Sequence, residues 1–320
     1  MTYPGTEILP LDDEARGKPK LTCVNGVPRV FAQRLPDHSV DEDGPMSFKD
    51  ILVHVDSTPA SRVRLRLAKA LAHRFGGHIS GLHVIPEPQV PPYFKPSAVE
   101  RIAEIYAQNA REAAKAAEVL FQEESQDTAK WSCVAGDPTE IIAERARFCD
   151  LLLLGQFDSQ SPQGISAFLL PAKVVLGAAS PILVVPNEAT SIDVGKRVVA
   201  AWDGSREAAR AIRDAIPLLQ NAEEVLLLTI DPDRQGHVQG GPNAAEFGTH
   251  LGRHSLHIVV EELASRSKNV SKTLLSQASQ FGADLLVMGA YGHSRVWEFI
   301  LGGTTQDVLQ GANIPIFISR

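Results

Sequence analysis

The chain has 320 residues, 44% of them hydrophobic, which is enough for two ordinary domains with sizeable cores. A formal net charge of -7 and a pI near 5.8 argue against a general nucleic-acid binder, because affinity for a phosphate backbone needs a basic face. The sequence shows neither an apolar run long enough to span a membrane nor a secretory signal pattern. We therefore expect a cytoplasmic protein that binds neither nucleic acid nor membranes.

The three cysteines, Cys23, Cys133 and Cys149, are scattered along the chain. Their spacing is not that of metal ligands, and an odd number argues against a disulfide framework. We expect no metal site at these residues.

Residues 1–47 form a distinct N-terminal segment with six prolines and no sustained apolar period. Because prolines at this density remove backbone hydrogen bonds, the composition predicts a mostly disordered tail. A short apolar patch at Val27, Val30 and Phe31 is the part with the capacity to dock. Since Met46 opens a phrase typical of a domain start, MSFKDILVHVD, one hypothesis places the start of translation there.

From Phe48 onward, apolar strand runs alternate with helical patterns. Strands are predicted at 51–55, 79–85, 129–134, 151–154 and 182–185. Helices are predicted at 61–75 and 99–124, and a third begins after Asp137, which can cap a helix that has Pro138 at its first position.

The same order then repeats. Strands are predicted at 198–202, 225–230, 256–260, 285–288 and 316–319. Helices are predicted at 205–220, 244–253 and 270–281. This alternation indicates the α/β class with two tandem open, five-stranded parallel sheets flanked by helices. The predicted domains are residues 48–190 and 196–320.

A glycine-rich stretch near the C-terminus, residues 284–309, follows a buried strand and has the chemistry of a phosphate cradle. Glycine lets backbone N–H groups approach a ligand closely, and hydroxyls add donors. The residues of this type are Gly289, Gly292, Gly302, Gly303, Thr304 and Thr305.

Three positions of the first copy recur in the second at a constant spacing of 134 residues. The pairs are Asp150 with Asp284, Gly155 with Gly289, and Pro181 with Pro315. The same alignment replaces the later cradle positions in the first copy with Asp158, Phe168, Leu169 and Pro171. An acid would repel a phosphate and large side chains would block the backbone, so we expect phosphate binding in the second copy alone.

These residues resemble the universal stress protein family in its tandem form. The resemblance rests on the glycine set at its spacing, on the strand that ends in Asp203, and on the terminal NIPIFIS strand, and it covers about residues 48–320. It implies a Rossmann-like fold that holds adenine nucleotides at the carboxyl ends of its strands. The implied ligand is ATP, alone or with Mg²⁺.

The resemblance implies a set of nucleotide contacts in the second copy. Asp203 would contact ribose or adenine, and Ile230 would line the adenine pocket. From their own chemistry, His293 and Arg295 either add positive charge near the phosphates or are solvent-exposed residues at a helix start. The full set is Ala201, Trp202, Asp203, Ile230, Met288, Gly289, Gly292, His293, Gly302, Gly303, Thr304 and Thr305.

Two positions depart from or complicate this pattern. The family has Ser or Thr directly after the third glycine, whereas this chain has Gly303, which keeps the N–H donor and lacks the hydroxyl. The indole of Trp202 has three alternatives: it stacks on adenine, blocks it, or packs against the sheet.

Competing functions leave different marks on the sequence. A dinucleotide-dependent dehydrogenase needs a glycine fingerprint in the first turn, which reads DSTPAS or DGSREA here, and a P-loop hydrolase needs a Gly-Lys-Ser/Thr end that is missing. No catalytic constellation stands out, and His54, His83, His250, His254 and His257 are expected to be structural or surface residues. A slow ATPase and a nucleotide-free interaction protein remain as alternatives.

The sequence thus predicts a stress-response regulatory protein that binds ATP in its C-terminal domain. A homodimer and a regulatory protein partner of unknown identity are the expected protein contacts. The two copies differ most at the proline-rich loop 86–96 and the long helix after it, where we expect a second ligand or partner.

Overall fold

The computed structural model describes residues 20–24, 27–31, 47–87, 96–125, 129–156, 170–189, 192–231, 243–264, 269–290 and 303–320. The first half contains β3 (Asp50–His54), α1 (Ala60–Phe75), β4 (His78–Ile85), α2 (Pro96–Glu124), β5 (Lys130–Ala135), α3 (Pro138–Arg145), η2 (Ala146–Phe148), β6 (Leu151–Gly155), α5 (Leu170–Gly177) and β7 (Ile182–Val185).

The second half repeats this order of strands and helices. It contains β8 (Arg197–Ala201), α6 (Arg206–Asp214), α7 (Ile216–Leu219), β9 (Glu224–Ile230), α8 (Ala244–Gly252), β10 (Ile258–Leu263), α9 (Val270–Phe281), β11 (Leu285–Gly289), α10 (Gly303–Gly311) and β12 (Ile316–Ser319). The sequence pattern did not delimit the short helices α5 and α10. The strand predicted at 256–260 is β10, which begins two residues later, at Ile258.

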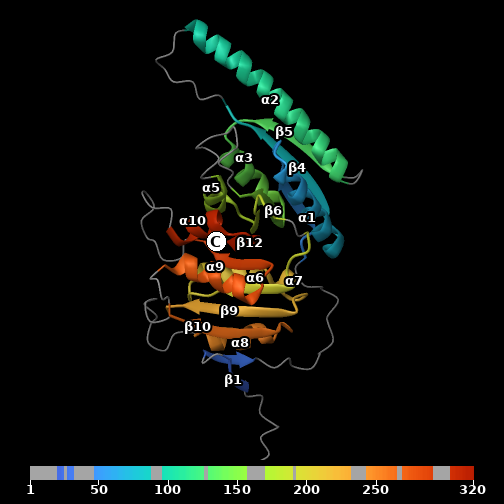
Figure 1. The fold of residues 1–320 in the computed structure, drawn as a ribbon. Coiled ribbons are helices and arrows are strands. Elements are labelled where there is room, and N and C mark those ends of the chain that lie inside the picture. The colour runs from blue at the N-terminus through green and yellow to red at the C-terminus, as the bar shows by residue number, and fades with distance from the viewer. Residues whose placement is uncertain are drawn as a thin grey trace, which may run out of the picture.

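Two further strands, β1 (Lys20–Val24) and β2 (Val27–Phe31), precede these halves. All the strands form one continuous sheet with the order β1-β2-β10-β9-β8-β11-β12-β7-β6-β3-β4-β5 (Figure 1). The five strands of each half run parallel to one another, which confirms the predicted fold class. The last strands of the two halves, β7 and β12, pair antiparallel and join the two sheets. The halves are therefore related as the two members of an internal pseudo-dimer.

Helices cover both faces of this sheet, and the buried side chains form two core clusters. One cluster takes residues from α1, α2, α6, α7 and α8, and the other takes residues from α3, α5, α9 and α10. Each cluster includes strand residues of both halves, so the core is continuous across the β7–β12 junction.

The repeated aspartate and proline have the same structural role in each half. The Asp150 carboxylate accepts from the backbone N–H groups of Lys49 and Asp50 at 2.8 Å, ahead of β3. Asp284 accepts from Gly195 at 2.9 Å in the corresponding place ahead of β8. The carbonyls of Pro181 and Pro315 each accept a backbone hydrogen bond at 3.0 Å from the neighbouring strand. These repeats therefore define the fold and not the ligand.

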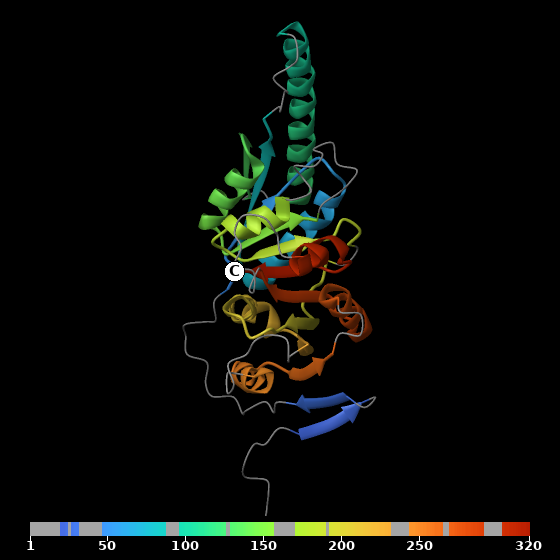
Figure 2. The ribbon, with the colours of Figure 1, turned by 90° about the vertical axis from the view of Figure 1, so that its left-hand side faces the viewer.

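The N-terminal segment differs from its prediction. Lys20–Val24 (β1) and Val27–Phe31 (β2) form an antiparallel hairpin, and β2 pairs with β10 at the edge of the sheet (Figure 2). These two strands contain the apolar patch Val27, Val30 and Phe31 that has the capacity to dock, whereas composition alone predicts a mostly disordered tail. Residues 1–19, 25–26 and 32–46 of the segment, Met46 included, lie outside the described residues. The physical reason is that an open sheet edge offers unpaired backbone groups, which a composition-based argument does not detect.

Candidate functional site

The candidate site of the second half is built around Asp203, which follows β8 at the turn into α6. Gly204 takes a φ of 73°, and the backbone N–H and hydroxyl of Ser205 then donate to Asp203 Oδ1 at 3.0 and 2.5 Å. The Ser205 hydroxyl also accepts from the N–H of Ala208 at 3.1 Å and so caps α6. The half-buried carboxylate of Asp203 is thereby held at the positive end of this helix.

Three predicted residues lie near the carboxyl ends of adjacent strands. Ala201 ends β8, Ile230 ends β9 and Met288 precedes the end of β11, and β8 pairs with both of the other strands. Ile230 and Met288 are buried, and Ala201 is half-buried. Ile230 and Met288 belong to a core cluster and Ala201 packs against it. Their contact with a nucleotide stays a prediction.

Of the three alternatives for the Trp202 indole, the structure shows the one in which it packs within the protein. Its ring lies 4.0 Å from the ring of Phe247 in α8 at an interplanar angle of 10°, and only 5% of the residue is exposed. The indole packs in the core, and its contact with a nucleotide stays a prediction.

Gly289 and Gly303 differ in the space around them. A Cβ at Gly289 would lie 2.4 Å from the backbone N of Ala208 and from the backbone C of Glu207, so this glycine lets α6 approach β11. A Cβ at Gly303 would meet nothing within 4 Å among the residues that the structure describes, which do not include residues 291–302 just before it. Gly303 begins α10, with Thr304 exposed and Thr305 buried behind it. The predicted residues Gly292, His293 and Gly302 lie outside the described residues.

The different surroundings of Gly289 and Gly303 predict different effects on stability when each is changed to alanine. Gly289→Ala should lower the free energy of unfolding by about 2 kcal/mol, because helix backbone has to move to admit the methyl group. Gly303→Ala should leave it unchanged or raise it by up to about 1 kcal/mol, since alanine loses less backbone entropy in a helix. Urea unfolding of the two variants tests this. Equal effects would mean that close packing does not explain Gly289.

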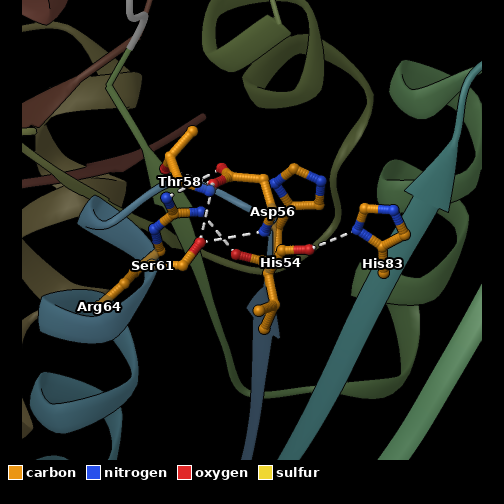
Figure 3. Close-up of polar contacts among 7 residues, drawn as sticks. His54, Asp56, Thr58, Ser61, Arg64 and His83 are labelled. Carbon is orange, nitrogen blue, oxygen red and sulfur yellow. Dashed lines mark hydrogen bonds and ion pairs between the residues drawn. The ribbon is translucent and has the colours of Figure 1, made fainter. Parts of the chain in front are cut away.

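The equivalent site of the first half is occupied by its own side chains (Figure 3). Asp56 follows β3 as Asp203 follows β8, and its carboxylate accepts from Thr58 and from the Ser61 hydroxyl, the latter at 2.9 Å. Nη2 of Arg64 lies 3.1 Å from Asp56 Oδ2, and Nη1 donates to the His54 carbonyl at 2.5 Å. Asp56 is therefore committed to partners within the protein.

Arg64 also explains Gly155, the counterpart of Gly289. A Cβ at Gly155 would lie 2.6 Å from Nη2 of Arg64, where the second half has helix backbone beside its glycine. The Arg64 side chain is 1% exposed, and its Nε has no partner among the residues that the structure describes. The same glycine thus serves different neighbours in the two halves.

Burial sets the electrostatics of this cluster. Burial, helped by the positive charge of Arg64 and by His83, lowers the pKa of His54 to about 4, although Asp56 acts in the opposite direction. Burial alone would raise the pKa of Asp56, but the charges of Arg64 and His54 and the hydrogen bonds from Thr58 outweigh it and lower that pKa. At neutral pH the cluster therefore holds a carboxylate, a guanidinium and a neutral imidazole.

The second buried histidine, His83, is held by a backbone carbonyl of the adjacent strand region. His83 Nδ1 lies 2.8 Å from the carbonyl oxygen of Val55 (Figure 3). In the second half, the rings of His250 and His254 meet edge to face with their centroids 5.3 Å apart. The pKa of His254 is lowered, chiefly by burial and to a smaller extent by the nearby His250. Throughout the described ranges, no group of three or more His, Cys, Asp or Glu side chains is arranged to hold a metal ion.

Known proteins identify the family of the chain. The profile of the Universal stress protein family matches residues 47–186 and again 195–320. The chain belongs to the universal stress protein family.

Its relatives among universal stress proteins are distant. It is similar to Universal stress protein Slr1230 of Synechocystis, at 26% identity over 152 residues that cover 46% of this chain and 50% of that protein. The match thus spans about half the length of this relative. A universal stress protein structure from Archaeoglobus fulgidus shares the fold, with a TM-score of 0.62, 18% identity, and coverage of 86% of this chain and 97% of the other.

Sequence reasoning missed Arg64, the residue that most distinguishes the two universal stress protein repeats. A signal was present, because Arg64 falls in the helical series of Ser61, Ala68 and Leu71, all of which are buried on α1. A charged side chain on the apolar face of a helix requires a partner.

Within the described part of the chain, no helix is both long and apolar enough to span a membrane.

Proposed function

We propose that the C-terminal half of this universal stress protein binds ATP at the carboxyl ends of β8, β9 and β11, and that the protein acts as a stress-response regulator. The observation that carries the proposal is the position of Asp203. Its carboxylate is held at the start of α6, on the edge of the sheet where ligands of open parallel sheets bind, beside Ala201, Ile230 and Met288.

The open start of α10 supports a place for the phosphates. None of the described residues lies within 4 Å of a Cβ at Gly303, so they leave room for a ligand beside this part of the backbone. The first N–H groups of a helix are unpaired and carry partial positive charge, which suits an anion. Thr304 adds an exposed hydroxyl there. In this arrangement Asp203 would accept hydrogen bonds from the ribose, and the start of α10 would hold the phosphates with their Mg²⁺.

The first half supports the assignment by contrast. Asp56 is engaged by a buried arginine, and Gly155 is covered by the same side chain. A nucleotide at that position would have to displace Arg64 and leave its charge without a partner in the interior, which is costly. We therefore assign nucleotide binding to one half only.

Isothermal titration with ATP and Mg²⁺ tests the proposal. The wild type should bind one ATP per chain, and Gly292→Asp, which places the first repeat's residue in the second, should abolish binding by charge repulsion. Gly303→Ser should tighten binding by about fivefold, because the added hydroxyl is equivalent to about 1 kcal/mol of hydrogen bonding and fits without a clash.

The controls separate the remaining alternatives. Asp158→Gly removes the acid that the first repeat has in place of Gly292 and should leave the stoichiometry at one. Nucleotide released by denaturing the freshly purified protein identifies what the site holds. Failure of the wild type to bind, or equal binding by Gly292→Asp, would favour the nucleotide-free interaction protein. Steady production of ADP would favour the slow ATPase.

A further inference from the structure

The long helix α2 carries a row of exposed residues that the nucleotide site does not use. It spans 29 residues, and Figures 1 and 2 show its amino-terminal part extending beyond the strands of the sheet. Among residues 100–124, whose burial the structure describes, the buried ones are Ala117 and Phe121 near the carboxyl end, and Phe121 packs on Trp131 with ring centroids 5.1 Å apart. The carboxyl end of the helix is thus anchored in the core. In the amino-terminal half, which we call the free half, the Tyr106 hydroxyl donates to the Pro86 carbonyl at 2.7 Å, and Ile102 and Ile105 are exposed.

The exposed row follows coiled-coil spacing. Ile102, Ile105 and Val119 are 38%, 56% and 45% exposed, which is unusual for large apolar side chains. Together with intervening residues they occupy alternating steps of three and four along α2, the pattern of a helix seam. The positions are Ile102, Ile105, Asn109, Glu112, Ala116, Val119 and Glu123.

A shallow groove lies over the anchored half of the same row. It has a volume of about 410 Å³. It is lined by Glu112, Ala116, Val119 and Glu123 of the row, by Lys115 and Leu120 beside the row, and by Arg62 of α1. The groove therefore continues the seam onto the body of the protein. The free half carries two isoleucines, and the anchored half offers small apolar side chains with space beside them.

The row can pair with the same row of a second copy when the two helices are related by a two-fold axis between Ala110 and Arg111. A two-fold axis at that point sets Ile102 opposite Val119 of a second copy and Ile105 opposite Ala116, with large side chains facing smaller ones. The same axis sets Asn109 opposite Glu112, where the amide can donate to the carboxylate.

The charges at the ends of the row match in the same way. Arg101 is exposed and forms no ion pair within the described residues. The axis brings it near Glu123 of the second copy, whose side chain is 52% exposed although it also holds Arg62 at 2.8 Å. Opposite charges at both ends of an antiparallel pair favour this register over the parallel one.

We propose that α2 is a homodimer interface, in which the α2 helices of two chains pack antiparallel and the free half of each fills the groove of the other. The contact spans the 17-residue interval from Ile102 to Val119, a length of about 26 Å at the rise of an α-helix. Because an interface of this size is small, we expect a dissociation constant on the order of micromolar.

Sedimentation velocity over a range of concentrations tests the interface. The wild type should be a dimer at about 100 μM, and Ile105→Glu should weaken dimerisation by about tenfold or more, since it buries a charge at the seam. Ile192→Glu is the matched control, because this isoleucine is 46% exposed outside α2, and it should dimerise as the wild type does. A monomeric wild type, or equal dimerisation by Ile105→Glu, would overturn the proposal.

Disulfide trapping tests the orientation independently. In a chain with Cys23, Cys133 and Cys149 changed to serine, Ile102→Cys combined with Val119→Cys should cross-link two chains rapidly under mild oxidation. Ile102→Cys alone should cross-link at least about tenfold more slowly, because the two copies of residue 102 lie at opposite ends of an antiparallel pair. Equal rates would overturn the antiparallel arrangement. Both substitutions are at exposed positions, and unchanged circular dichroism confirms the fold.

Discussion

Arg64→Met is expected to lower the free energy of unfolding by about 3–5 kcal/mol at pH 7. The guanidinium is almost completely buried, forms the ion pair with Asp56 and donates to the His54 carbonyl. Methionine fills much of the same volume but leaves the Asp56 carboxylate, whose side chain is 20% exposed, without its cation and with Thr58 and Ser61 as its remaining described donors. Urea unfolding followed by tryptophan fluorescence measures the difference from the wild type.

The neighbouring turn of α1 supplies a matched control. Arg66 forms an ion pair with Glu124 at 3.0 Å, but its side chain is 51% exposed. Arg66→Met should therefore cost less than about 1 kcal/mol, as exposed pairs usually do. If the two variants lost equal stability, burial would not be what makes Arg64 important.

A double-mutant cycle then isolates the pair itself. Asp56→Asn combined with Arg64→Met removes both charges, so the double variant should be more stable than the sum of the two single losses predicts. Simple additivity would show that the ion pair at 3.1 Å contributes nothing beyond the separate environments of its members.

Much of this structure can be predicted from the sequence, because its signals are local. Alternating strand and helix patterns give the two five-stranded sheets, and the 134-residue repeat matches Asp150 with Asp284, which the structure shows capping equivalent strands. Asp137 caps α3 as predicted, accepting from Thr139 at 2.7 Å. Period and capping act within a few residues, so a single sequence reveals them.

The features that escaped prediction depend on contacts between distant segments. The β2 strand pairs with β10, although the two strands are separated in the sequence by more than half the chain. The β7 strand pairs with β12 through backbone hydrogen bonds, which do not depend on the side-chain pattern. The packing of Trp202 on Phe247 depends on where α8 lies relative to β8. For the candidate site, the sequence identifies the residues of the strand ends, while only the structure distinguishes the close packing at Gly289 from the open space at Gly303.

The buried histidine His54 is expected to make the protein lose about 3 kcal/mol of stability between pH 6.5 and pH 4. Its pKa falls from 6.5 to about 4 in the folded state, chiefly because burial disfavours the charged ring. Between these values the unfolded chain binds a proton that the folded chain does not, so stability falls as the pH decreases through this range. The difference between the two pKa values corresponds to about 3 kcal/mol.

The carboxylate beside His54 contributes in a separate pH range. The pKa of Asp56 is lowered from an ordinary value of 3.8, so its stabilisation is fully present above that value and is lost only as the pH falls further. The loss between pH 6.5 and pH 4 is therefore assigned to the histidine and not to its acidic neighbour.

Urea unfolding at intervals from pH 7.5 to pH 4 measures this dependence, and His54→Gln is the informative variant because glutamine is polar and does not titrate. The variant should lose about 3 kcal/mol less than the wild type across this range, whatever its stability at pH 7.5. Proton NMR of the folded wild type gives a second readout, in which the His54 ring stays neutral at pH 5.5. Parallel pH profiles for the two proteins, or a ring that is charged at pH 5.5, would contradict the prediction.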